Sequence, residues 1–167
     1  AYFVSDPLKN LRGFDTTPQT QRRAITTDEV RRLLAVCPTY RRLLWETALL
    51  SGLGANELRH LSIDHLDVER GGLYLDASWT KNRRDDFLPL PRSLVHRLHI
   101  FATTGEVTQK YQQVYASKEV PRRVPTHPLL YVPRDPAREL DKGLKAAAIP
   151  KYTREGKVDF HALRLAY

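Results

Sequence analysis

The sequence has 167 residues, 41% of them hydrophobic, which is enough to bury one core and predicts one main domain. Lys and Arg total 27 against 19 Asp and Glu, and the net charge of +8 favours an anionic partner such as nucleic acid, although a merely soluble basic protein would look the same. The single cysteine, Cys37, excludes an internal disulfide and a cysteine-rich zinc site, and its place on an apolar helical face predicts a buried thiol. No apolar run is long enough for a membrane span, so we expect an intracellular soluble protein without a membrane partner.

The first half of the chain predicts helices after an irregular start. Residues 1–25 are polar, basic and without periodicity, which is typical of a linker. Thr26 and Glu29 have the spacing of a capping box and predict a helix that Pro38 ends. Residues 40–50 are apolar on most sides and predict a central, buried helix, and a short helix over 56–61 follows the Ser51–Gly52 stop.

The second half predicts a small sheet followed by further helices. Residues 66–90 alternate around a Gly71–Gly72 turn and predict two or three short antiparallel strands. Pro91 opens a helix, residues 103–128 show no assignable pattern, and residues 129–132 form a short buried segment. A helix over 137–148 and a last one after the N-cap Asp159 complete an α+β fold that is mainly α-helical.

Three stretches have the chemistry to act on one phosphate. They are the turn SGLGANEL at 51–58, the strand tip TKNRRDD at 80–86, and HALR at 161–164, where His161 and Arg164 share one face of a helix start. Each has an ordinary reading when it is taken alone: a helix corner, a solvated tip and a surface pair. Their order along the chain makes the combination informative.

Together these stretches resemble the catalytic domain of the tyrosine recombinases, the phage integrase family. Gly52, Leu53, Glu57 and Leu58 match the first family box, TKNRRDDFLPLP resembles the lysine hairpin, and FHALRLAY resembles the second box. The resemblance runs from about residue 25 to the end. It implies an integrase catalytic domain over 25–167, incomplete at its C-terminus, and makes residues 1–24 the linker and tail of an upstream DNA-clamping domain.

The resemblance also implies a reaction and a set of site residues. In the family, a tyrosine hydroxyl attacks a DNA phosphodiester and leaves a 3′-phosphotyrosyl link, without a metal or another cofactor. Arg164 corresponds to a phosphate-binding arginine, His161 to the residue that bonds the phosphate and manages the tyrosine proton, and Lys81 to the general acid. Four further basic side chains are expected to contact DNA: Arg22, Arg23, Arg83 and Arg84. Partners are double-stranded DNA and further copies, up to a tetramer, in a bacterial or phage-like cytoplasm at the nucleoid.

Two departures from the family pattern bear on activity. The first arginine of the family falls on Gly54, and neither Arg41 nor Arg59 stands in the matching position. The nucleophilic tyrosine is expected beyond residue 167, since Tyr167 matches an aromatic core position. We therefore expect the chain as given not to cleave DNA, because loss of one charge-stabilising donor alone costs about 10²- to 10³-fold in rate.

Three hypotheses follow from the sequence. The first is a site-specific DNA recombinase that retains Lys81, His161 and Arg164. The second is a degenerate, non-catalytic recombinase-like DNA-binding domain, which Gly54 favours. The third is a basic helical interaction domain unrelated to DNA, whose binding would not respond to salt.

Overall fold

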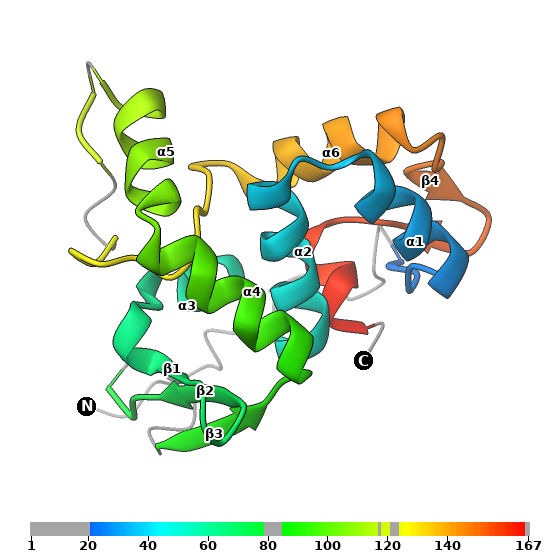
Figure 1. Ribbon diagram of the computed structural model, residues 1–167. Coiled ribbons are helices and arrows are strands. Elements are labelled where there is room, and N and C mark those ends of the chain that lie inside the picture. The colour runs from blue at the N-terminus through cyan, green and yellow to red at the C-terminus, as the bar shows by residue number, and fades with distance from the viewer. Residues whose placement is uncertain (1–20, 79–84, 117, 121–123, 166–167) are drawn as a thin grey trace, which may run out of the picture.

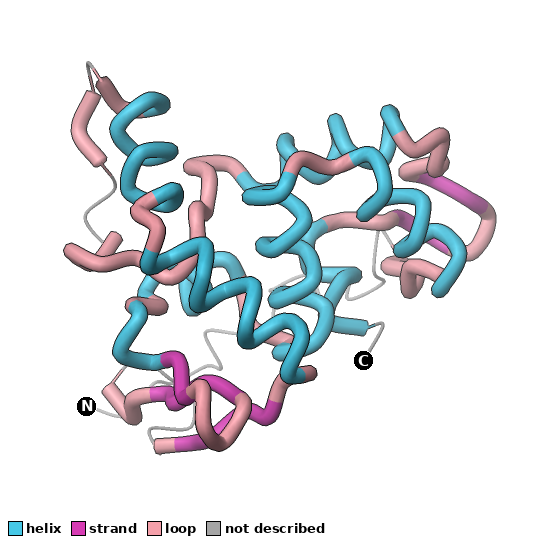
Figure 2. Tube along the Cα trace, in the orientation of Figure 1, coloured by secondary structure: helices cyan, strands magenta, loops and turns pink. Residues whose placement is uncertain are grey.

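The structure is a computed structural model that describes residues 21–78, 85–116, 118–120 and 124–165 (Figure 1). Helices dominate it, with small antiparallel sheets at two places, as the tube in Figure 2 shows. The predicted α+β class with a helical majority is confirmed. None of the described helices has both the length and the apolar run that crossing a bilayer requires.

The helices of the first half form as their sequence patterns predict. Helix α1 (Thr27–Val36) begins with the complete Thr26–Glu29 capping box, and Leu33 on its apolar face is fully buried. Cys37 follows as its C-cap and lies against the core, where burial raises the pKa of its thiol. Helix α2 (Thr39–Ser51) ends at Gly52, and the short α3 is Ala55–His60.

Helix α2 is the centre of the core. Its residues 43–49 are all buried, and it packs against α1, α4 (Arg92–Thr103) and the C-terminal 3₁₀ helix η2 (Phe160–Leu165) (Figure 1). Trp45 has no exposed surface, and its ring meets the edge of Phe160 at a centroid distance of 5.8 Å. Glu46, 8% exposed, is neutralised by Arg42 at 3.1 Å and Arg97 at 2.6 Å. The predicted central helix is confirmed.

A three-stranded antiparallel sheet follows the 3₁₀ helix η1 (Ile63–His65). Its order is β1 (Leu66–Asp67), β2 (Gly72–Leu75) and β3 (Asp86–Pro89), with Leu75 opposite Asp86. The amide of Ala77 donates to Asp85 Oδ1 at 2.8 Å and closes the β2–β3 connection at its base. Because β2 and β3 are adjacent and antiparallel, residues 76–85 connect them as the predicted hairpin.

Several elements lie outside the sequence-based expectations. Helix α5 (Glu106–Val114) occupies part of the segment that showed no pattern, and only Val107 and Tyr111 of this helix are buried. After α6 (Pro136–Ala146), a two-stranded hairpin of β4 (Tyr152–Thr153) and β5 (Gly156–Lys157) precedes η2. The last helix is 3₁₀ and not α because the N–H of Ala162 bonds to the carbonyl of Asp159, three residues back, at 2.9 Å.

Candidate nucleic-acid interface

The turn between α2 and α3 is built around Gly52 and not around Gly54. Gly52 has a left-handed backbone (φ 65°) and donates its N–H to the carbonyl of Ala48 at 3.1 Å, as expected of a helix-ending glycine. Gly54 has φ −79° and ψ 166°, which any residue adopts. The backbone therefore does not require a glycine at position 54.

Glu57 holds the amide at position 54 in place. Its Oε2 accepts a hydrogen bond of 2.6 Å from the N–H of Gly54, and the carbonyl of Gly54 accepts the N–H of Leu58 at 2.9 Å. Leu53, 6% exposed, and Leu58, fully buried, fix the two sides of the turn in the core. Position 54 is thus firmly placed although it carries no side chain.

Helix η2 places the second predicted box beside α2. Ala162 and Leu163 are fully buried, whereas His161 is exposed. Positions 161 and 164 lie one 3₁₀ turn apart and so share one side of η2. The side chain of Arg164 lies outside the described part of the structure. The turn at 51–54 ends α2 and η2 packs on α2, so the same helix supports both boxes.

The lysine hairpin is described only at its base. Strands β2 and β3 are paired as predicted, whereas Lys81, Arg83 and Arg84 lie outside the described residues. The roles assigned to these three side chains therefore stay predictions.

Arg22 and Arg23 differ in their surroundings. The Nε of Arg22 lies 3.1 Å from Asp159 Oδ2, and 51% of the Arg22 side chain is exposed. Arg23 is 7% exposed and donates two hydrogen bonds of 2.8 Å to Glu29. Its buried guanidinium holds the start of α1, and this geometry speaks against the predicted DNA contact at Arg23. Arg22 remains accessible from solvent.

The two arginines considered as substitutes for the one missing at position 54, Arg41 and Arg59, are engaged elsewhere. Arg59 donates to Asn56 Oδ1 at 3.0 Å and to the carbonyl of Pro133 at 2.9 Å. Arg41 forms an ion pair of 2.7 Å with Glu139. Neither guanidinium is free to replace the arginine that the family has at position 54, in agreement with their mismatched positions in the sequence.

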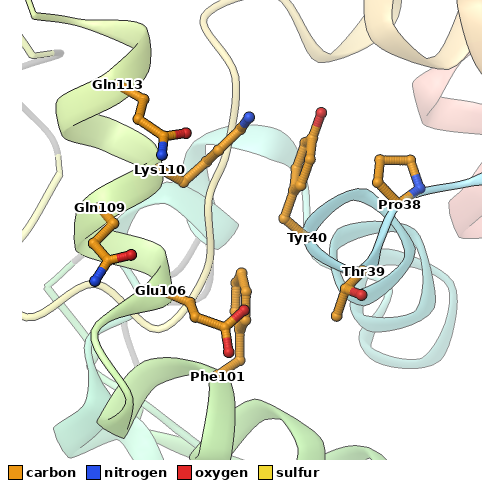
Figure 3. A pocket seen from close by; sticks show the side chains of 8 residues that line it. All are labelled: Pro38, Thr39, Tyr40, Phe101, Glu106, Gln109, Lys110 and Gln113. Carbon is orange, nitrogen blue, oxygen red and sulfur yellow. The ribbon is translucent and has the colours of Figure 1, made fainter.

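A hollow lies at the opposite end of α2 from Gly52. It has a volume of about 320 Å³ between the start of α2 and α5, and Lys110 Nζ lies 4.3 Å from the centroid of the Tyr40 ring beside it (Figure 3). None of the predicted site residues that the structure describes lines this hollow. Its lining consists of Pro38, Thr39, Tyr40, Phe101, Glu106, Gln109, Lys110 and Gln113. Among the described residues, no group of three or more His, Cys, Asp or Glu has the arrangement of a metal site.

Comparison with known proteins identifies the family of this chain. The model of the phage integrase family matches residues 23–167, which is most of the chain and includes both boxes. The chain belongs to the phage integrase family. It has the fold of a tyrosine recombinase catalytic domain, as the resemblance predicted.

Individual relatives of this integrase domain are distant. Tyrosine recombinase XerA of Thermococcus kodakarensis is 28% identical over 118 residues, which cover 66% of this chain and 41% of that protein. The crystal structure of XerA recombinase has a TM-score of 0.57 at 21% identity and covers 89% of this chain and 50% of that one. The crystal structure of lambda integrase residues 75–356 bound to DNA has a TM-score of 0.53 at 20% identity and covers 89% of this chain and 51% of that one. The chain therefore spans about half the length of these relatives or less.

Sequence reasoning missed the ionic contact between Arg22 and Asp159. Asp159 was expected only as an N-cap, and its Oδ1 does accept the N–H of Ala162 at 3.0 Å. The same carboxylate also binds Arg22, 137 residues earlier in the chain. Burial opposes ionisation of Asp159, but the hydrogen bonds from Arg22 and Ala162 outweigh it and hold its pKa below the ordinary value. The opposite charges of Arg22 and Asp159 are the only feature of the sequence that is compatible with this pair, and they do not identify the two residues as partners.

Proposed function

We propose that this chain is the catalytic-domain part of a site-specific DNA recombinase that acts on double-stranded DNA through a 3′-phosphotyrosyl intermediate. The observation that carries the proposal is the family match over residues 23–167, which includes both boxes. Support comes from α2, which carries the turn at position 54 at its end and η2 along its side. A fixed scaffold under both boxes suits a reaction that depends on placing charge around one phosphate.

The proposed chemistry assigns one task to each retained group. A tyrosine oxygen attacks the phosphorus and displaces the 5′-oxygen of the neighbouring nucleotide, which Lys81 protonates. Arg164 binds the non-bridging oxygens, and His161 bonds the phosphate and takes part in moving the tyrosine proton. The exposure of His161 suits contact with an external phosphate. We assign the role of the attacking nucleophile to none of the tyrosines in this chain.

The organisation around the domain is part of the same proposal. Residues 25–167 form the catalytic domain, and residues 1–24 lead from a DNA-clamping domain. The protein assembles on DNA as a tetramer in a bacterial or phage-like cytoplasm, at the nucleoid. Lambda integrase, a structural neighbour, has been crystallised on DNA as a dimer, which supports binding of double-stranded DNA by more than one copy.

A second candidate is a degenerate domain that binds DNA without chemistry. Position 54 is held by Glu57 in the turn where the family has a phosphate-binding arginine, yet it carries no side chain. Arg41 and Arg59 are bonded elsewhere, so nothing in the turn supplies the missing cation. We infer that loss of this donor lowers the cleavage rate about 10²- to 10³-fold.

A suicide-substrate assay on the intact protein that carries this chain tests both candidates. Nicked duplexes trap a covalent protein–DNA adduct, which is measured for the natural protein, for Gly54→Arg, and for the natural protein with added guanidinium ion. An adduct formed by the natural protein without guanidinium ion rejects the degenerate candidate. An adduct that needs the arginine or guanidinium supports it. Absence of both adduct and duplex binding in every sample rejects both candidates.

A further inference from the structure

The carboxylate of Asp159 joins two segments that are distant in the sequence. Its Oδ2 accepts a hydrogen bond of 3.1 Å from Arg22 Nε, and Lys157 Nζ lies 4.0 Å from the same oxygen. Its Oδ1 accepts the N–H of Ala162 at 3.0 Å, at the start of η2. One carboxylate therefore connects Arg22 to the first turn of the helix that carries His161.

The backbone of residues 21–23, here called the incoming segment, lies against the β4–β5 hairpin. The N–H of Arg23 donates to the carbonyl of Lys157 at 3.1 Å, and the N–H of Lys157 donates to the carbonyl of Gln21 at 2.8 Å. A Cβ at Gly156 would lie 2.4 Å from the carbonyl oxygen of Gln21, so the glycine permits this close approach. From β5 the chain runs directly into η2 (Figure 1).

The incoming segment is also fixed on its other side. Arg23 binds Glu29 of α1 with two hydrogen bonds and the carbonyl of Pro150 with a third of 3.1 Å. An ordinary surface ion pair contributes little because both side chains lose freedom when it forms. The backbone of Arg22 is already held by its neighbours, and Asp159 has only 19% of its side chain exposed. This pair therefore keeps more of its attraction than a pair between two free surface side chains.

We propose that Arg22 is a positioning residue, which fixes Asp159 and through it the place of His161. This role rests on the proposed function in so far as His161 binds phosphate. Without the guanidinium, Asp159 Oδ1 is held less firmly toward the amide of Ala162. That amide keeps its bond of 2.9 Å to the carbonyl of Asp159, and η2 loses one restraint at its start. Arg22 then matters for the geometry of the second box more than for attraction to DNA.

Hydrogen exchange without DNA tests the positioning itself. Arg22→Gln is compared with Arg31→Gln, which removes the same charge from an exposed position on α1, and the amide of Leu98 in the core reports global stability. We expect Arg22→Gln to lower the protection of the Ala162 amide about three- to tenfold, the range expected for loss of one ordinary hydrogen bond, with Leu98 unchanged. Arg31→Gln should leave both amides unchanged. Equal protection of Ala162 in the two variants would overturn the proposal.

The ring signal of His161 in NMR spectra gives a second, independent measurement. We expect it to move in Arg22→Gln, to stay in place in Arg31→Gln, and to return in Arg22→Lys, which restores a cation for Asp159. An unmoved His161 signal in Arg22→Gln would overturn the proposal. Addition of a DNA duplex separates this result from the proposed function. If the His161 signal of the natural protein does not change when DNA is added, this result counts against the proposed function. The spectra recorded without DNA still test the positioning role of Arg22.

Discussion

At the scale of single residues, Gly52 and Gly54 have opposite reasons for being glycine. Gly52 has φ 65°, a conformation in which other L-residues are strained, whereas Gly54 has φ −79°. The first glycine serves the fold and the second does not. The arginine that the family resemblance leads us to expect at position 54 would therefore stand where the backbone accepts any side chain.

Gly54→Arg should therefore leave the fold intact. We expect the free energy of unfolding, measured by urea titration, to change by less than about 1 kcal/mol, because the backbone needs no adjustment. Gly52→Ala is the matched control. No atom lies within 4 Å of its added Cβ, so its expected cost of about 1–2 kcal/mol is purely conformational. A large loss of stability in Gly54→Arg, equal to that of Gly52→Ala, would contradict this reading.

Glu29 provides a prediction about acid stability. The side-chain hydrogen bond from Arg23 is the largest influence and lowers the pKa of Glu29 from 4.5 to about 2, with both side chains largely shielded from solvent. A lowered folded-state pKa stabilises the fold above the unfolded value of 4.5, and this contribution is lost as the pH falls toward 2. It amounts to roughly 3 kcal/mol.

Glu29→Gln removes this titration. We expect the variant to be less stable by about 3–5 kcal/mol at neutral pH, because Arg23 is left buried without its counter-charge. Its unfolding free energy should also fall less steeply than that of the natural protein between pH 4.5 and 2. Urea titrations at several pH values measure both effects. Parallel pH profiles for the two proteins would show that Glu29 does not titrate as described.

At the scale of elements, local sequence signals locate most helices and strands. The Thr26 capping box, Pro91 and the alternation at 66–90 each mark an element that the structure contains. Helix α5 was missed although Val107, Tyr111 and Val114 stand at helical spacing, because this stripe is short and only its first two residues are buried. The strands β4 and β5 are two residues long and too short for an alternating pattern.

The candidate site was predictable only where it depends on neighbouring residues. The spacing within SGLGANEL and HALR places the turn and η2 correctly, because caps and helix faces are local features. The bonds of Arg22 to Asp159 and of Arg59 to Pro133 join residues 137 and 74 positions apart. Such contacts arise from tertiary packing, and no local pattern in the sequence encodes them.

The β2–β3 pair, which supports the lysine hairpin, depends on a close approach at Gly72. An added Cβ would lie 2.3 Å from the carbonyl oxygen of Leu88 and 2.6 Å from the ring of Phe87. Gly72→Ala should therefore cost about 1–3 kcal/mol in thermal or urea unfolding. In Gly143→Ala the nearest atom is the flexible end of Leu33 at 2.9 Å, and the gain in helix propensity offsets the adjustment. Similar losses in both variants would show that strand approach is not the cause.

At the scale of the whole molecule, the net charge of +8 predicts that the affinity of the proposed DNA complex depends on salt. Each phosphate that a cation neutralises adds about −0.9 to the slope of log K against log salt, so three or more contacts give a slope of about −3 or steeper. Fluorescence anisotropy with a labelled duplex measures this slope. Arg164→Gln should reduce its magnitude by about one, whereas Arg134→Gln, at a hollow near α5 and α6, should leave it unchanged. A flat response to salt would favour an interaction domain unrelated to DNA, and equal effects of the two variants would remove Arg164 from the phosphate contacts.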